Sequence, residues 1–290
     1  HNNLAAFIAT FGEAAQIERY LDEMIRGRKV GAFLLTEPNA GSDAQAIETV
    51  AVPDGDGWRL RGDKAWISNA MSADVLCETI LTILDLAAAF LVDADADGIR
   101  QSDPYDLMRG HALGTGAFHF DGCRVTREQM ILAPGAAFRG AMAGINTARI
   151  NVAAMCCGML RESLRIAVSY ADERRAFGRS TLEFQGLNWL LAEVATDLEA
   201  AAALTRDAIR CAERGDDPTL AAAHAKKFAT RAAFDGVAEC MQAMGAAGYD
   251  AAYPLARHLA AAKMAQFLDG TTQIQNVVIA RALKTQYADL

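Results

Sequence analysis

The sequence lacks the patterns that identify metal-binding and disulfide-rich proteins. Its 290 residues include six cysteines, at positions 77, 123, 156, 157, 211 and 240, and none of them forms a CxxC pair or a Cys/His metal spacing. We therefore predict no metal site. Scattered cysteines of this kind are typical of core packing in a reducing compartment, so we expect a cytoplasmic protein.

Long apolar runs and an excess of basic residues are also missing. No run reaches the roughly 20 apolar residues that span a bilayer, so we expect no membrane span. No signal peptide is visible, but the chain opens at His1 rather than at a methionine, so we expect that its true start is not included. The formal net charge is −8, which argues against a nucleic-acid partner because phosphate binding needs a basic surface.

Common catalytic and nucleotide-binding motifs are absent as well. There is no Walker loop and no GxGxxG, and the five histidines form no cluster from which a Ser-His-Asp set could be proposed. The chemistry must therefore come from residues that are individually less distinctive.

Composition divides the chain into three parts. Residues 1–30 contain apolar side chains at helical spacing, which predicts one helix over Leu4–Gly27. Residues 31–140 are typical of a β domain, with strands at Ile47–Val52 and Trp58–Ile67 joined by a turn-forming Pro-Asp-Gly-Asp-Gly run. Residues 141–290 are rich in alanine and predict an antiparallel helical bundle. The fold class is thus α+β and multi-domain.

The bundle is predicted to consist of long helices with short links. We expect them at Asn146–Arg174, Gln185–Arg214, Pro218–Met244, Pro254–Gln266 and after Gly270.

The segment Glu78–Phe90 does not fit a single strand. It is too long and uniformly apolar for one antiparallel strand, and it contains none of the turn residues that would divide it. We interpret it as two strands whose connecting loop has been deleted.

Asp269 stands out because it precedes a Gly-Thr-Thr turn and follows the apolar flank Ala261–Phe267. A carboxylate at such a buried edge can cap the following helix, pair with a cation or accept a proton. The stretch itself leaves these alternatives open.

Four further motifs suit a large planar cofactor, although each also has an ordinary structural explanation. Thr36–Asp43 is a turn rich in hydroxyls and backbone N–H groups. Trp66 and Ser68 lie two apart on a predicted strand and so share one face, although a tryptophan taken in isolation is more often a core residue. Arg174–Arg179 and Gln242–Tyr249 each end a helix, where cations and glycines are common.

Taken together, in this order and spacing, these motifs resemble the acyl-CoA dehydrogenase family over nearly the whole chain. The resemblance implies an N-terminal helical domain that is largely absent here, a middle antiparallel β domain and a C-terminal helical bundle. It also implies FAD as the cofactor, an acyl-CoA substrate, a homotetramer and an electron-transfer flavoprotein as electron acceptor.

The resemblance assigns cofactor and substrate contacts residue by residue. The residues implied to bind FAD are Phe33, Leu35, Thr36, Ser42, Trp66, Ser68, Arg174, Phe177, Gln185, Gln242, Gly245, Thr271 and Gln273. Those implied to contact the substrate are Ser42, Arg149, Leu268 and Gly270. Arg174, Phe177 and Gln185 match residues that reach the cofactor of a neighbouring subunit. Ser68 stands where Thr is more frequent, and Ala246 replaces a common Gly.

Asp269 falls where most members of the family carry a catalytic Glu. A minority of the family's branches place the base instead at the residue just before the one that matches Arg149. Here that residue is Ala148, which cannot accept a proton. The resemblance therefore implies that Asp269 is the catalytic base of FAD-dependent dehydrogenation. Two alternatives remain: a flavin oxidase like nitroalkane oxidase, which uses Asp here, and a catalytically silent subunit of a heteromeric dehydrogenase.

Overall fold

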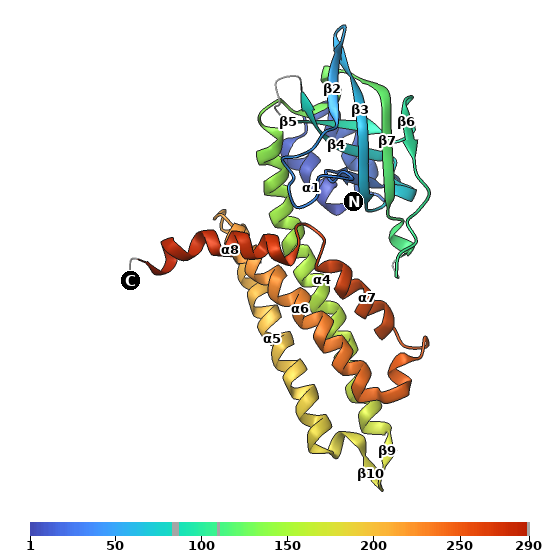
Figure 1. The fold of residues 1–290 in the computed structure, drawn as a ribbon, viewed down its shortest axis with the longest axis vertical. Coiled ribbons are helices and arrows are strands. Elements are labelled where there is room, and N and C mark those ends of the chain that lie inside the picture. The colour runs from blue at the N-terminus through green and yellow to red at the C-terminus, as the bar shows by residue number, and fades with distance from the viewer. Residues whose placement is uncertain (83–86, 109–110, 289–290) are drawn as a thin grey trace. The chain divides into compact units, whose positions relative to one another are not determined.

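The computed structural model describes residues 1–82, 87–108 and 111–288, which form two compact units. The first unit spans His1–Ile145 and holds the β-sheet, and the second spans Asn146–Leu290 and is helical (Figure 1). This is the predicted fold class, a β domain followed by a helical bundle, and it is confirmed. The division falls within the long helix α4.

The N-terminal segment is helical but not one helix. Its elements are α1 (Asn2–Phe11), α2 (Ala14–Gln16), the π-helix η1 (Ile17–Leu21) and α3 (Asp22–Ile25). The prediction of a single helix was wrong because Gly12 adopts an extended conformation, and Glu13 and Gln16 form a capping box that starts a new helix. A side chain at position 12 would also meet the Ile8 carbonyl oxygen at 2.5 Å.

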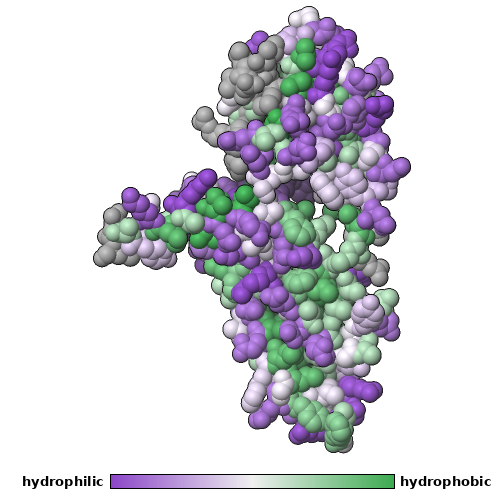
Figure 2. Space-filling view, viewed as in Figure 1, coloured by the Kyte–Doolittle hydropathy of each residue, from purple (hydrophilic) through white to green (hydrophobic). Residues whose placement is uncertain are grey.

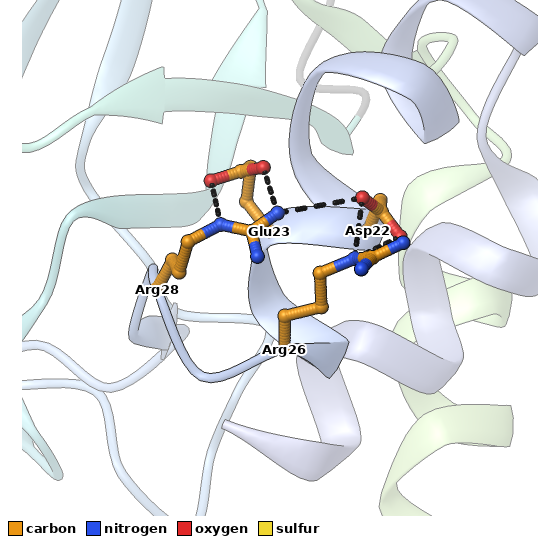
Figure 3. A network of polar contacts seen from close by, with 4 residues as sticks. All are labelled: Asp22, Glu23, Arg26 and Arg28. Carbon is orange, nitrogen blue, oxygen red and sulfur yellow. Dashed lines mark hydrogen bonds and ion pairs between the residues drawn. The ribbon is translucent and has the colours of Figure 1, made fainter.

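The end of α3 is tied down by an exposed network of charges (Figure 3). Arg26 Nε donates to Asp22 at 2.9 Å, and Arg28 Nε donates to Glu23 at 2.8 Å. Gly27 takes a left-handed φ of 69° and stops the helix. Asp22, Arg26 and Arg28 are more than half exposed and Glu23 is about one-third exposed, so the network contributes little stability and mainly fixes the local chain direction.

In the part of the chain that the structure describes, the sheet contains eight strands. They are β1 (Gly31–Leu34), β2 (Val50–Asp54), β3 (Gly57–Ile67), β4 (Val75–Thr82), β5 (Ala87–Asp93), β6 (Ile99–Gln101), β7 (Gly116–Val125) and β8 (Met130–Leu132). The order is β6-β7-β3-β2-β4-β5-β8, and β1 pairs with β4. Most neighbours are antiparallel, but β4 runs parallel to both β1 and β2.

The sequence signals for the strands have clear physical counterparts. The predicted hairpin is formed by β2 and β3, with Gly55 at a positive φ of 65° in the two-residue turn. Gly57 is needed because a Cβ there would meet the Val125 carbonyl oxygen at 2.3 Å. The buried side chains of Leu34, Leu60 and Phe90 belong to one hydrophobic core cluster of this unit.

The segment Glu78–Phe90 contributes to two strands, as its composition predicted. Its residues belong to β4 and β5, which pair antiparallel with Glu78 opposite Phe90 and Ile80 opposite Ala88. Residues 83–86, where the deleted loop was expected, lie outside the described part of the chain.

The helical unit follows the predicted order closely. Its elements are α4 (Ala137–Glu173), α5 (Gln185–Glu213), α6 (Thr219–Met244), α7 (Leu255–Ala265) and α8 (Thr272–Tyr287), with a hairpin of β9 (Arg175–Ala176) and β10 (Arg179–Ser180). Short 3₁₀ helices complete the described chain: η2 (Ala70–Ser72), η3 (His111–Leu113), η4 (Arg127–Gln129), η5 (Thr181–Glu183) and η6 (Gly245–Tyr249). Within the described ranges, no helix combines the length and apolar character required to cross a membrane.

Small residues allow the helices of this unit to pack closely. The buried face of α6 is mostly alanine, and Gly236 lies where a Cβ would meet Leu160 at 2.7 Å and Val194 at 3.1 Å. The alanine-rich composition is therefore a packing requirement of α6 against α4 and α5.

A buried charge cluster holds the turn after β1 against the sheet. The side chain of Lys64, on β3, is fully buried and donates to Glu37 Oε1 at 2.8 Å and to the Thr79 carbonyl oxygen at 2.6 Å. Glu37 in turn accepts hydrogen bonds from the backbone N–H groups of Glu48 at 2.6 Å and Thr49 at 3.1 Å. The ends of the segment between residues 37 and 49 are therefore joined through one carboxylate.

The same lysine faces a second buried carboxyl group, that of Glu78, at 3.6 Å. Burial raises the pKa of Glu78 to about 8, even though Lys64 acts in the opposite direction. Burial acts to raise the pKa of Glu37 too, but the charge of Lys64 and the hydrogen bonds to this carboxylate outweigh it and lower the pKa. At neutral pH the cluster thus combines an ionised Glu37 with a protonated Glu78.

This arrangement predicts how stability depends on pH. Native Glu78 keeps its proton up to a pKa of about 8, whereas an unfolded glutamate releases it near pH 4.3. Stability is therefore lost as pH rises through that window, by up to about 1.4 kcal/mol per pH unit. Glu78→Gln should make the melting temperature less dependent on pH between about 5 and 8. The exposed Glu48→Gln is the control, and equal pH dependence in both variants would contradict the prediction.

Candidate active site

Asp269 lies in the short connection between α7 and α8 and has a left-handed backbone, with φ of 50°. Gly270 follows at φ of 91°, so two consecutive residues form a tight left-handed turn. An aspartate at positive φ is uncommon and stores backbone strain, which other contacts must hold in place. The side chain of Asp269 is partly buried.

Two cations from other helices hold this turn by its backbone. Arg149 Nε, on α4, donates to the carbonyl oxygen of Asp269 at 3.0 Å. Lys226 Nζ, on α6, donates to the carbonyl oxygen of Gly270 at 2.5 Å. Figure 1 shows the connection between α7 and α8 crossing α4 within the helical unit. Both cationic side chains are buried, which makes these bonds stronger than their surface equivalents.

The turn also changes the proton affinity of the Asp269 carboxyl. Burial raises its pKa above the ordinary value, and the positive charges of Lys226 and Arg149 partly oppose that rise. A carboxylate with a raised pKa is a better proton acceptor than an ordinary surface aspartate.

The capping alternative for Asp269 is not what the structure uses. The N-cap of α8 is Thr271, whose side chain accepts from the Ile274 N–H at 3.3 Å. Gln275 Nε2 donates to the Gly270 carbonyl oxygen at 2.8 Å and supports the turn from the helix itself. The carboxylate of Asp269 therefore does not serve as the cap of α8.

Leu268 and Gly270, implied to contact substrate, lie in this same connection and are partly buried. Thr271 and Gln273, implied to bind cofactor, are the N-cap and a first-turn residue of α8, and Gln273 is exposed. Arg149, also implied to contact substrate, donates its Nε to the Asp269 carbonyl oxygen, and its substrate contact stays a prediction.

In the β unit, the predicted cofactor residues follow β1 and end β3. Leu35 and Thr36 come directly after β1, and Ser42 is exposed on the loop tied down by Glu37. Phe33 lies on β1, and its ring contacts Phe7 at 5.6 Å between centroids.

Trp66 occupies an irregular position in β3. It has a positive φ of 59°, lies where the register between β3 and β7 shifts, and is 61% exposed. Its ring packs against Tyr105 at 4.7 Å between centroids. The strand ends at Ile67, so strand alternation does not extend to Ser68, which follows it. A bulge of this kind re-aims side chains and is frequent beside functional sites.

The remaining predicted cofactor residues belong to the helical unit. Phe177 sits at the tip of the β9–β10 hairpin, with a positive φ of 52° and 96% of its surface exposed. Arg174 precedes that hairpin and Gln185 begins α5, and both are exposed. Gln242 is exposed in the last turn of α6, and Gly245 ends the helix at φ of 60°.

Sequence reasoning missed the buried lysine of each unit, Lys64 and Lys226, and the two buried glutamates that face Lys64. Lys226 had one available signal, because it shares a helical face with Ala222, Ala229 and Ala233, where an apolar residue is expected. Among the described residues, no group of three or more His, Cys, Asp or Glu side chains is placed to hold a metal ion.

Comparison with known proteins gives one family for both units. The middle domain of the acyl-CoA dehydrogenase family matches residues 32–123, and its C-terminal domain matches residues 136–284.

Individual relatives agree with this assignment. The mitochondrial short-chain specific acyl-CoA dehydrogenase of Sus scrofa is 35% identical over 285 residues, covering 97% of this chain and 69% of that protein. The structure of butyryl-CoA dehydrogenase from Megasphaera elsdenii superposes with a TM-score of 0.93 at 34% identity, covering 96% of this chain and 74% of that one.

A structure described as the electron transferring flavoprotein of Acidaminococcus fermentans, in work on flavin-based electron bifurcation, also has a TM-score of 0.93. It is 37% identical and covers 96% of this chain and 74% of its own. With domain matches over most of the sequence and relatives above 30% identity, this chain belongs to the acyl-CoA dehydrogenase family.

Proposed function

We propose that this protein catalyses the α,β-dehydrogenation of a short-chain acyl-CoA thioester, with Asp269 as the base that removes the α proton. The observation that carries the proposal is a carboxylate with a raised pKa on a strained turn that Arg149 and Lys226 hold in place. The names of the Sus scrofa and Megasphaera elsdenii relatives support a short acyl chain.

FAD is the cofactor of the family, and the residues present fit such a group. The bulge in β3 leaves the indole of Trp66 exposed as a planar apolar surface, with a hydroxyl two residues later at Ser68. Thr36 and Ser42 add hydroxyls on the loop anchored by Glu37. When bound, FAD supplies the acceptor for the hydride that leaves the β carbon.

The chain's own part in the reaction is the proton transfer. An Asp269 oxygen accepts the α proton as the Cα–H bond breaks, and the electrons of that bond form the double bond to the β carbon. Arg149 and Lys226 stay positively charged near the carboxylate, so they favour its ionised form before the transfer. Their hydrogen bonds to the backbone of Asp269 and Gly270 hold the turn, and with it the carboxylate, in a fixed position.

The assembly and electron acceptor also belong to the proposal. Homotetramer formation is supported by the fully exposed Phe177 at a strained hairpin tip and by the apolar side chains on this face of the helical unit (Figure 2). An electron-transfer flavoprotein as acceptor is supported by the Acidaminococcus fermentans neighbour. A cytoplasmic location is supported by six free cysteines, five of them buried.

The first experiment on this proposal replaces the base without changing its size. Asp269→Asn should retain FAD but reduce flavin by short-chain acyl-CoA about 100- to 10,000-fold more slowly, because general-base catalysis contributes about that much. Stopped-flow absorbance of the flavin under anaerobic conditions measures the rate. Reduction of the Asn variant at the wild-type rate would show that another carboxylate is the base.

Lengthening the base separates the dehydrogenase from a flavin oxidase. Glu is longer than Asp by one methylene, and a displacement of about 1 Å can change a rate by about 100-fold. Asp269→Glu should keep or raise the rate with acyl-CoA if the site is built for a thioester. A lower rate with acyl-CoA, together with hydrogen peroxide formation from a nitroalkane by the wild type, would favour the oxidase. No reaction with either substrate would favour a silent subunit.

Assembly is tested at the hairpin tip. Phe177→Asn keeps a residue that tolerates the left-handed backbone but removes the exposed ring. For this variant we expect light scattering to show a smaller assembly than that of the wild type, and fluorescence titration to show weaker FAD binding. The melting temperature of the dissociated monomer should be unchanged. A wild-type protein that is monomeric when loaded with flavin would contradict the homotetramer.

A further inference from the structure

We infer that Lys226 is a positioning residue for Asp269, which it serves by holding the turn around the base and by contributing a buried positive charge; the inference rests on the proposed function of Asp269 as a base. Lys226 lies on α6, and its side chain is fully buried. It acts through the backbone of the turn, not by contact with a ligand.

The contacts of Lys226 bracket the base along the chain. Its Nζ donates to the carbonyl oxygen of Gly270 at 2.5 Å and to that of Gln266 at 3.4 Å. These two acceptors lie one residue after and three residues before Asp269. One ammonium group thus joins the C-terminal end of α7 to the left-handed turn. This contact fixes the position of the turn that carries Asp269 relative to the end of α7.

Arg149 and Gln275 complete the support of the same turn. Arg149 Nε donates to the Asp269 carbonyl oxygen at 3.0 Å, and Gln275 Nε2 donates to the Gly270 carbonyl oxygen at 2.8 Å. Three helices, α4, α6 and α8, therefore each supply one donor. Of these three donors, Arg149 and Lys226 are positively charged. Arg149 also donates from Nη1 to Asn146 Oδ1 at 3.2 Å.

A buried lysine bonded to carbonyl oxygens is a poor solution for stability alone. Desolvation of the ammonium group is unfavourable, and an apolar side chain of similar length would pack in the same alanine-rich face without that penalty. Of the groups that act on Lys226, Asp269 favours its charged form, whereas Arg149 opposes it. Cys156 contributes little at neutral pH because burial raises the pKa of its thiol to about 12. The positive charge of Lys226 therefore acts mainly on Asp269 and on the carbonyl oxygens of its turn.

The two functions of Lys226 make distinct predictions for pH dependence. Removing its charge takes away the first of the two cations that oppose the raised pKa of Asp269, so that pKa should rise further. Burial lowers the pKa of Lys226 itself to about 8, so the wild-type rate should fall on the alkaline side as the ammonium group loses its proton. A purely structural lysine would change neither limb of the profile.

The test compares Lys226→Met, Lys226→Gln and Lys226→Arg with Lys227→Met. Lys227 is the next residue of α6 and is exposed, so it is a matched control for the same substitution. Each flavin-loaded protein is mixed anaerobically with butyryl-CoA, and the rate constant of flavin reduction is measured across pH. FAD affinity and melting temperature are measured in parallel.

We expect Lys226→Met to slow reduction about 100-fold, the size of effect that a displacement of about 1 Å produces, with its acid limb moved to higher pH. Lys226→Gln keeps a donor without charge, so it should recover part of the rate but not the position of the acid limb. Lys226→Arg should recover both the rate and the position of the acid limb. It should lose the alkaline limb, because arginine stays protonated. Lys227→Met should match the wild type.

A readout that does not depend on turnover separates this inference from the proposed function. Infrared difference spectra of the apoprotein, with Asp269→Asn as the reference, report protonation of the Asp269 carboxyl directly. If the wild type fails to reduce flavin but Lys226→Met raises the pKa of Asp269, the proposed function fails and the inference stands. If the wild type is active and Lys226→Met or Lys226→Gln keeps its rate, both pH limbs and the infrared titration, the inference is overturned.

Discussion

The candidate site depends on hydrogen bonds from two buried cations to the backbone of one turn. Asp269 and Gly270 both have left-handed backbones, a conformation that is uncommon for an aspartate and carries some strain. Arg149 and Lys226 donate to the carbonyl oxygens of these two residues, and they come from α4 and α6, which lie far from the turn in sequence. The packing of the helical unit is therefore also what holds the base in place.

The alanine-rich helices acquire a functional meaning from this arrangement. Close packing of α4, α5 and α6, with Gly236 against Leu160, fixes the points from which the two long side chains reach the turn. Bonds of a buried ammonium or guanidinium group to carbonyl oxygens tolerate little displacement, since an unsatisfied buried charge is strongly unfavourable. The β unit solves a similar problem with Lys64, which anchors the loop that carries Thr36 and Ser42 through Glu37.

Much of this organisation is predictable from the sequence, and the remainder has identifiable physical causes. The helical spacing of apolar residues and the positions of Gly and Pro predicted α5 to within one residue at its end, and they also predicted the β2–β3 hairpin. Helix faces and Gly-containing turns leave local signals in the sequence. Gly12 ended the expected first helix by taking an extended conformation in which the Ile8 carbonyl oxygen leaves no room for a Cβ, and periodicity does not reveal this. Asp269 was identified by its neighbours in sequence, but Lys226 and Arg149 act on it from other helices. Whether a lysine in an alanine-rich helix is buried, and what it then binds, depends on tertiary contacts that local pattern does not contain.

The most direct measurement of the central claim follows the α proton itself, separately from the redox step. The flavin-loaded protein is incubated with butyryl-CoA in D₂O without an electron acceptor, and mass spectrometry measures deuterium at the α carbon of the recovered thioester. If Asp269 is the base, the wild type incorporates deuterium and Asp269→Asn, with the same FAD content, does not. Incorporation by the Asn variant at the wild-type rate would contradict the assignment of the base to this turn.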